Sequence, residues 1–220
     1  MFEPEIINMI TENFGVSIYM VVVSTLFSYL LGLPLGVILV VTAPGGLKPM
    51  PLFNQVLGVI VNLLRSVPFL ILLFVIMPFT QFITGSSFGA NATIVPLVVS
   101  AAPFVARLIE SSFKEIDFGV IEAAQSMGAS NWQIITKVML PESKPSLLVG
   151  SAIAATTILG YSAMAGVVGG GGLGDIAIRY GFYRYQNDLM YVCVILLVII
   201  TQIIQEAGLR IANRTDKRLH

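Results

Sequence analysis

The sequence predicts an all-α membrane protein with five transmembrane helices, and two observations lead to this fold class. The first is composition: of 220 residues, 56% are hydrophobic and only 11% are charged, with a mean hydropathy of +0.88. Ordinary soluble domains carry about 25% charged residues. The second is that the apolar residues form long runs, because a helix that crosses a bilayer needs about 20 mostly apolar residues. The length suits a single transmembrane domain over residues 1–220.

The charge and cysteine content exclude several classes of protein. Twelve basic residues balance twelve acidic ones, so the chain has no polybasic character and no nucleic-acid partner is expected. One cysteine, Cys193, lies inside an apolar run, so neither a disulfide framework nor a cysteine-based metal site is predicted. The acidic start, MFEPEIINMITENFG, lacks the basic region of a cleavable signal peptide, and none is expected.

Five apolar runs define the expected spans. They cover about 16–41, 66–83, 92–112, 146–168 and 189–207. Residues 1–15 are expected to form a short polar cap or a separate interfacial helix. In the first span, Gly32 and Gly36 have the small-xxx-small spacing that lets helices approach closely, and Pro34 between them is a candidate kink.

Two arginines flank the middle spans. An arginine at bilayer mid-depth costs at least ~2.5–3.5 kcal/mol, so Arg65 is expected at the cytoplasmic interface. The amphipathic stretch Leu52–Leu64 before it would then lie partly along the membrane surface. Arg107 is late enough in the third span to extend toward the interface or to pair with Glu110.

The fourth span is rich in small and hydroxyl residues, which is typical of a helix packed among protein neighbours. This helix is our first candidate to line a transport path, with Ser151, Thr156, Thr157 and Ser162 as the path residues. The segment 169–188 that follows is predicted to be a polar, aromatic external segment that begins with a flexible glycine turn. Its G-x-G-x-x-G spacing is not a dinucleotide site, because no strand precedes it.

The distribution of Lys and Arg predicts the orientation of the chain, because cytoplasmic loops carry the excess of positive charge. With the C-terminus inside, only Arg179 and Arg184 fall outside. The basic residues on the inner side are then Lys48, Arg65, Arg107, Lys114, Lys137, Lys144, Arg210, Arg214, Lys217 and Arg218. We therefore expect the N-terminus outside, the C-terminus in the cytoplasm, and a cytoplasmic loop over residues 113–145.

Within that loop, Asp117–Pro141 has the signals of two short helices joined by an elbow. Asp117 is a predicted N-cap, and Gly128 falls where a C-terminal cap belongs. Ser130 and Gln133 have the spacing of a capping box that begins a second helix, and Pro141 is expected to mark its end. Such a unit between two spans is suited to docking a partner.

This segment resembles the permease subunits of ABC importers, which share the pattern E-A-A-x-x-x-G, nine residues, then I-x-L-P. The matching residues here are Glu122, Ala123, Ala124, Gly128, Leu140 and Pro141, while Val138 replaces the usual Ile. The resemblance implies a type I-like ABC importer permease in which these residues form a coupling helix that fits a groove in an ATPase subunit.

The stretches LLRSVPFLILL (63–73) and MAGVVGGGGLGDIAIRYGFYRYQNDLM (164–190) are similar to the permeases of bacterial methionine importers. This resemblance implies a protein of the bacterial inner membrane that works as two copies with two ATP-binding subunits and an external binding protein. It implies methionine as the solute, with both enantiomers as candidates. ATP would bind the partner subunit, and no cofactor or metal is expected on this chain.

Other classes of function stay open at this point. A permease for a different amino acid or an osmoprotectant would share the coupling segment. A passive channel would not need it. The sequence Gly160-Tyr161-Ser162-Ala163 faintly resembles an intramembrane protease motif, but a nucleophilic serine needs a general base. The only histidine, His220, is the last residue of a charged tail, so an enzyme is not expected.

Overall fold

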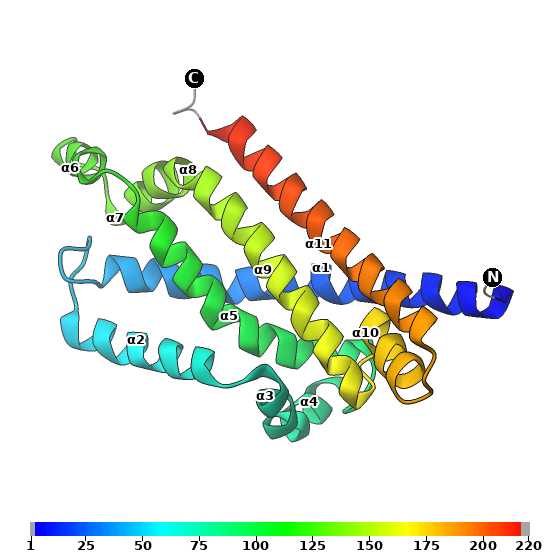
Figure 1. The fold of residues 1–220 in the computed structure, drawn as a ribbon. Coiled ribbons are helices and arrows are strands. Elements are labelled where there is room, and N and C mark those ends of the chain that lie inside the picture. The colour runs from blue at the N-terminus through cyan, green and yellow to red at the C-terminus, as the bar shows by residue number, and fades with distance from the viewer. Residues whose placement is uncertain (1–2, 217–220) are drawn as a thin grey trace.

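The computed structural model describes residues 3–216, which fold entirely into helices and connecting loops and confirm the predicted all-α class (Figure 1). The helices are α1 (Pro4–Val41), α2 (Pro51–Ser66), α3 (Phe69–Val75), α4 (Met77–Thr84), α5 (Ala90–Lys114), α6 (Phe118–Ser126), α7 (Asn131–Gln133), α8 (Leu140–Glu142), α9 (Lys144–Ala165), α10 (Gly172–Ile176) and α11 (Asn187–Thr215). Ile134–Met139 and Ala177–Phe182 are π-helical, and Gly166–Val168 is a 3-10 turn. Lys217, Arg218 and His220 lie outside the described residues.

The most extensive helix pairing is α1 with α5, and small residues make it possible. The buried side of α1 repeats every three to four residues: Ser17, Met20, Val21, Ser24, Ser28, Gly32, Gly36 and Leu39. A Cβ added at Gly32 would lie 2.8 Å from the carbonyl oxygen of Ala102, and one at Gly36 would lie 2.7 Å from that of Ala106. The predicted close approach at the two glycines is therefore present, and Pro34 lies inside the helix without ending it.

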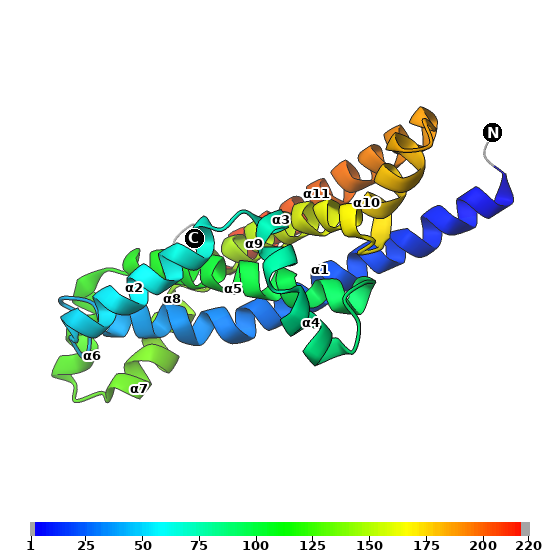
Figure 2. The same cartoon turned by 90° about the horizontal axis from the view of Figure 1, so that it is seen from below.

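The N-terminal residues do not form the separate cap or interfacial helix that the sequence suggested. They belong to α1, which is continuous for 38 residues from Pro4 to Val41. At a rise of about 1.5 Å per residue α1 is about 57 Å long, well beyond the ~30 Å of a hydrocarbon core. Figure 2 shows this helix running the length of the molecule, with α2 and α6 near one end and α10 toward the other. Its outer turns persist because they pack against α10.

The second expected span, 66–83, is not one helix. α2 and α3 pass the criteria for a membrane span only as a pair, and they are bent by 99° at Val67 and Pro68. Proline has no N–H and forces the preceding residue out of the helical region, as the extended Val67 (ψ 123°) shows. α4 begins after a further break, so the polypeptide here is a broken span.

Arg65 lies about halfway along the bundle, which corrects its expected place at the cytoplasmic interface. Its guanidinium carbon is 5.8 Å from the centre of the Phe104 ring. Phe104 precedes the end of α5 at Lys114 by about ten residues, or about 15 Å of helix. That distance is about half of the ~30 Å hydrocarbon core. The expectation failed because α2 packs against α1 and α5 instead of lying along the membrane surface.

The glycine-rich segment after α9 is packed, and the prediction of a flexible turn was wrong. All residues of Gly172–Ile176 are buried. The backbone N–H groups of its first two residues donate to Asn13 Oδ1 at 3.0 Å and to Ser17 Oγ at 2.9 Å, both on α1. Gly174 lies so close to α9 that an added Cβ would be 2.4 Å from the carbonyl oxygen of Ala163. The glycines allow α10 to close the end of the bundle.

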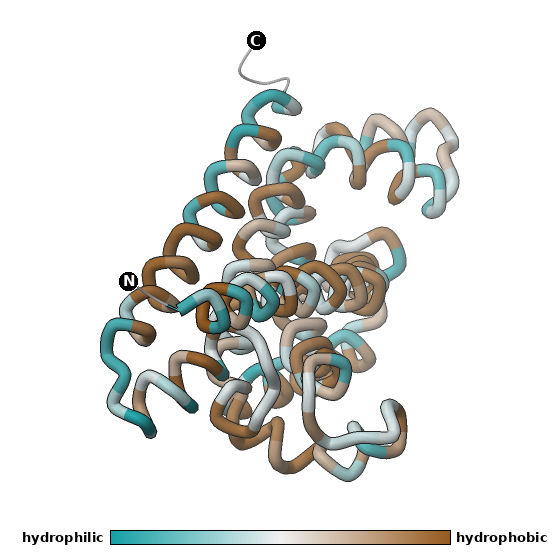
Figure 3. The backbone as a smooth tube through the Cα atoms, turned by 90° about the vertical axis from the view of Figure 1, so that its right-hand side faces the viewer, coloured by the Kyte–Doolittle hydropathy of each residue, from teal (hydrophilic) through white to brown (hydrophobic). Residues whose placement is uncertain are grey.

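Four helices are long and apolar enough to cross a membrane alone, and the bent pair raises the number to five among the described residues. The end-on view in Figure 3 shows α11 as apolar through its middle and polar at both ends. The central helix of the chain is α5, with 61% of its apolar window buried, whereas the corresponding figure for α9 is 33%. The small-residue helix α9 is therefore not the core of this single chain, and much of its surface is left for other neighbours.

Candidate coupling site and transport path

The elbow of the candidate coupling segment, residues 117–141, is built from local hydrogen bonds. Asp117 caps α6 by accepting from the Gly119 N–H at 2.7 Å, as predicted. Gly128 has φ +79°, its N–H donates to the Gln125 carbonyl at 2.9 Å, and the next N–H donates to the Ala124 carbonyl at 3.1 Å. This pair of bonds is the Schellman motif, which needs a left-handed residue at the Gly128 position.

The second helix begins with the predicted capping box. The Gln133 N–H donates to Ser130 Oγ at 3.4 Å, and the Ser130 N–H donates to Gln133 Oε1 at 2.8 Å. The chain stays helical from Asn131 to Glu142 and reaches its cap at Ser143. Pro141 is therefore not the boundary that the sequence suggested, because proline is tolerated in the first turn of a helical segment.

The Glu-Ala-Ala residues do not all face outward. Glu122 and Ala123 are exposed, whereas Ala124 is 4% exposed and packs with Ile134 and Met139. The idea that both alanines permit a close approach to a partner therefore holds for Ala123 alone. Ala124 has a structural role, since its small side chain lets α6 lie against the following helix.

Three large apolar side chains on this segment are exposed and were missed by the sequence reasoning. Phe118 is 63% exposed, Met127 81% and Trp132 73%. Large exposed apolar groups that gather in one place mark interaction sites. The signal was available, because an extramembrane loop has no structural need for an exposed Trp132 or Met127. We call Phe118, Glu122, Ala123, Met127 and Trp132 the docking face; Leu140 is half-buried and Pro141 exposed at the far end of the segment.

The four candidate path residues lie on α9, but the hydroxyl groups are already used within the helix. Ser151 donates to the Leu148 carbonyl, Thr156 and Thr157 both donate to that of Ile153, and Ser162 donates to that of Leu159, at 2.7–3.0 Å. Ser162 is buried and the other three are half-buried. Their hydroxyl oxygens retain acceptor capacity, so this arrangement offers weak contacts without a fixed charge.

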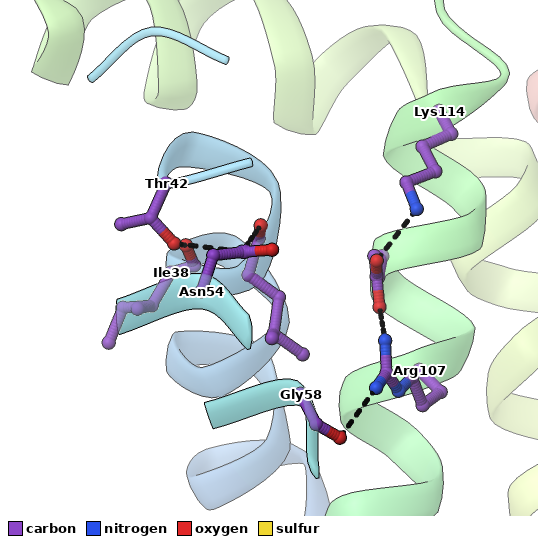
Figure 4. A network of polar contacts seen from close by, with 8 residues as sticks. Ile38, Thr42, Asn54, Gly58, Arg107 and Lys114 are labelled. Atoms are coloured by element: carbon purple, nitrogen blue, oxygen red, sulfur yellow. Dashed lines mark hydrogen bonds and ion pairs between the residues drawn. The ribbon is translucent and has the colours of Figure 1, made fainter. Parts of the chain in front are cut away.

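Polar contacts fix α2 against its neighbours (Figure 4). Asn54 Nδ2 donates to the Leu39 carbonyl at 2.6 Å and to Thr42 Oγ1 at 3.0 Å, which joins α2 to α1. Arg107 donates to the Gly58 carbonyl at 2.8 Å and pairs with Glu110 at 2.5 Å, which joins α2 to α5 and confirms the predicted ion pair. These bonds hold a helix that has only one fully buried residue.

A bundle of apolar helices with a rigid, outward-facing helix–glycine–helix unit at one end defines the class of membrane transport subunits that are driven by a docked partner. Residues 32–215 match the family described as binding-protein-dependent transport system inner membrane component. This match covers most of the sequence, and the chain belongs to that family.

Curated relatives narrow the similarity. The chain is 51% identical to a "Probable D-methionine transport system permease protein MetI" of Vibrio cholerae, over 92% of this chain and 90% of the relative. It is 43% identical to the "Methionine import system permease protein MetP" of Bacillus subtilis, over 82% of each chain. A solved structure of the MetNI methionine ABC transporter in inward-facing conformations superposes with a TM-score of 0.96, at 42% identity, over 98% of this chain and 100% of that one.

The fold extends to more distant transporters. The structure of an amino acid ABC transporter with histidines superposes with a TM-score of 0.71 at 18% identity, over 96% of this chain and 94% of that one. At this identity the likeness concerns the fold alone. It shows that the broken second span and the helical unit between α5 and α9 belong to a common permease architecture.

Proposed function

We propose that this chain is the membrane-spanning permease subunit of an ATP-driven importer that moves methionine into a bacterial cell. The observation that carries the proposal is the docking face, a rigid capped elbow with exposed apolar residues at one end of an apolar bundle. Relatives named as methionine permeases, at 43–51% identity, support methionine as the solute. ATP hydrolysis takes place on partner subunits, and alternating inward- and outward-open states carry the solute across.

The proposed assembly contains two copies of this chain, two ATP-binding subunits and an external binding protein. The α9 surface that the single chain leaves open supports a second copy, since small residues favour close helix packing in membranes. The docking face supports an ATP-binding subunit on the other side of the elbow. Lipid covers the remaining apolar surface, including most of α11.

The proposed orientation places the N-terminus outside and the C-terminus in the cytoplasm. The end of α11 supports it, because Asn213 and Asp216 line a cavity of about 290 Å³ together with Ser112 and Glu142, next to the coupling segment. The C-terminal end of α11 and the coupling segment therefore lie at the same end of the bundle, as Figure 1 shows.

Cysteine labelling tests this orientation. Single cysteines at Thr11, Ser130 and Thr215, in a Cys193→Ser background, are treated in intact cells with a thiol reagent that does not cross the membrane. Labelling is expected at position 11 alone, and at all three positions after the cells are opened. Labelling at position 130 in intact cells would contradict both the orientation and the cytoplasmic docking face.

Uptake by reconstituted vesicles tests the solute. Vesicles with this chain, its ATP-binding subunit and its binding protein receive labelled methionine, and parallel samples receive histidine or glycine betaine. ATP-dependent accumulation of methionine is expected, with both enantiomers tried separately. Accumulation of a competitor and none of methionine would leave an ABC importer of another solute.

A further inference from the structure

The C-terminal half of α2 presents a polar face that no other element of the chain covers. Asn62, Arg65 and Ser66 are all exposed and share one side of the helix, because residues three and four apart are neighbours. The Ser66 hydroxyl is satisfied by the Asn62 carbonyl at 2.8 Å. No carboxylate among the described residues pairs with Arg65, in contrast to Arg107, which Glu110 neutralises.

This unpaired arginine lies near the middle of the membrane. Its position beside Phe104, about 15 Å from the end of α5, leaves it far from either interface for the head group to reach water along the lipid. Ionisable side chains at this depth face protein or a water-filled cavity, because exposing them to lipid is costly. The Arg65 face of α2 is therefore turned toward the interior of the assembled transporter.

The same face adjoins the helix that carries the candidate path residues. The bend after α2 brings Phe69 onto Tyr161 of α9 as a parallel stack, with ring centres 4.8 Å apart. Thr157 lies one turn before Tyr161 on α9. Asn54 and the Gly58 carbonyl hold the first half of α2 in place, so Arg65 is carried on an anchored helix at a fixed height.

We infer that Arg65 binds the carboxylate of a zwitterionic amino acid as it passes through the permease, with Phe104 beside it as an apolar contact for the solute. A guanidinium group matches a carboxylate with two parallel hydrogen bonds, and its charge persists at every physiological pH. The hydroxyl-bearing face of α9 provides the weak polar surface on the other side. The inference rests on the proposed transport of an amino acid and adds the residue that holds its charged group.

The first experiment separates solute binding from coupling. In vesicles with the ATP-binding subunit and the binding protein, Arg65→Gln should lower methionine uptake at least about tenfold, the size expected for a charge-assisted hydrogen bond. ATP hydrolysis stimulated by the binding protein should persist, because the docking face is unchanged. Arg65→Lys should restore part of the uptake, and Arg210→Gln, at an exposed arginine on α11, serves as the matched control with normal uptake.

The second experiment detects the solute at the site itself. A cysteine at Asn62, in the Cys193→Ser background, reacts with a small water-soluble thiol reagent in the assembled transporter. Methionine should slow this reaction, methioninol, which lacks the carboxylate, should not, and Arg65→Gln should remove the protection. A reaction that methionine does not slow would overturn the inference and indicate that Arg65 holds a lipid phosphate or a carboxylate of the second copy.

The outcomes distinguish this inference from the proposed function. If the unmodified transporter accumulates no methionine, the proposed solute is wrong. If it accumulates methionine and the Arg65→Gln variant does so at the same rate, the role of Arg65 alone is overturned. A variant that loses thermal stability together with uptake and ATP hydrolysis would show a structural contact of Arg65 and would also overturn it.

Discussion

A Gly128→Val variant is expected to lose methionine uptake and binding-protein-stimulated ATP hydrolysis by at least about tenfold while the chain still inserts into the membrane. Valine at φ +79° costs about 1–3 kcal/mol, because a branched side chain is strained in the left-handed region. A Cβ at this position meets no neighbouring atom, so the effect comes from the backbone alone. The strain acts on the elbow and would displace Met127 and Trp132 on the docking face.

Two controls make the result specific to the elbow. Gly128→Asn should keep most of the activity, because asparagine tolerates the left-handed conformation. Gly85→Val introduces the same strain at φ +75°, also in open space, at the opposite end of the bundle, and should leave uptake near normal. Glu122→Lys should lower stimulated ATP hydrolysis through the docking face directly. Normal stimulated hydrolysis in both Gly128→Val and Glu122→Lys would show that this segment does not couple the subunits.

A Gly32→Val variant is expected to lose stability or fail to accumulate as a folded chain. The new side chain would meet the Ala102 carbonyl oxygen and the Val105 side chain at under 3 Å, so α1 and α5 would have to separate. Overpacking of this kind costs about 1–3 kcal/mol or more, and here it falls on the largest helix contact of the molecule.

The control for this variant lies on the same helix. Gly15 has no atom within 4 Å of an added Cβ, so Gly15→Val should keep the stability of the unmodified chain. Thermal unfolding in detergent, followed by size-exclusion chromatography, measures both variants under the same conditions. Equal unfolding temperatures for the Gly32 and Gly15 variants would contradict the close α1–α5 seam.

Local features of this chain were predictable from its sequence because their causes are local. The caps at Asp117 and Ser130 and the left-handed Gly128 depend on residues within three positions, and the structure has all three. The same holds for the Arg107–Glu110 pair, one turn apart on α5. Long apolar runs located the helices for a similar reason.

Features that depend on distant partners were not predictable. The glycine-rich segment is buried because Asn13 and Ser17, far away in the sequence, accept its N–H groups. Arg65 was placed at the interface because the cost of burying a charge was known but the course of α2 was not. The inward turn of Ala124 likewise follows from the packing of α6 on the helix after the elbow.

The length of α1 has a mechanical consequence. Its outer turns are bonded to the α10 cap through Asn13 and Ser17, and its inner end is bonded to α2 through Leu39 and Thr42. One rod of about 57 Å therefore joins the two faces of the membrane. A push on the external cap, such as a landing binding protein would give, need not pass from helix to helix: it tilts a single lever whose far end carries the helix with Arg65.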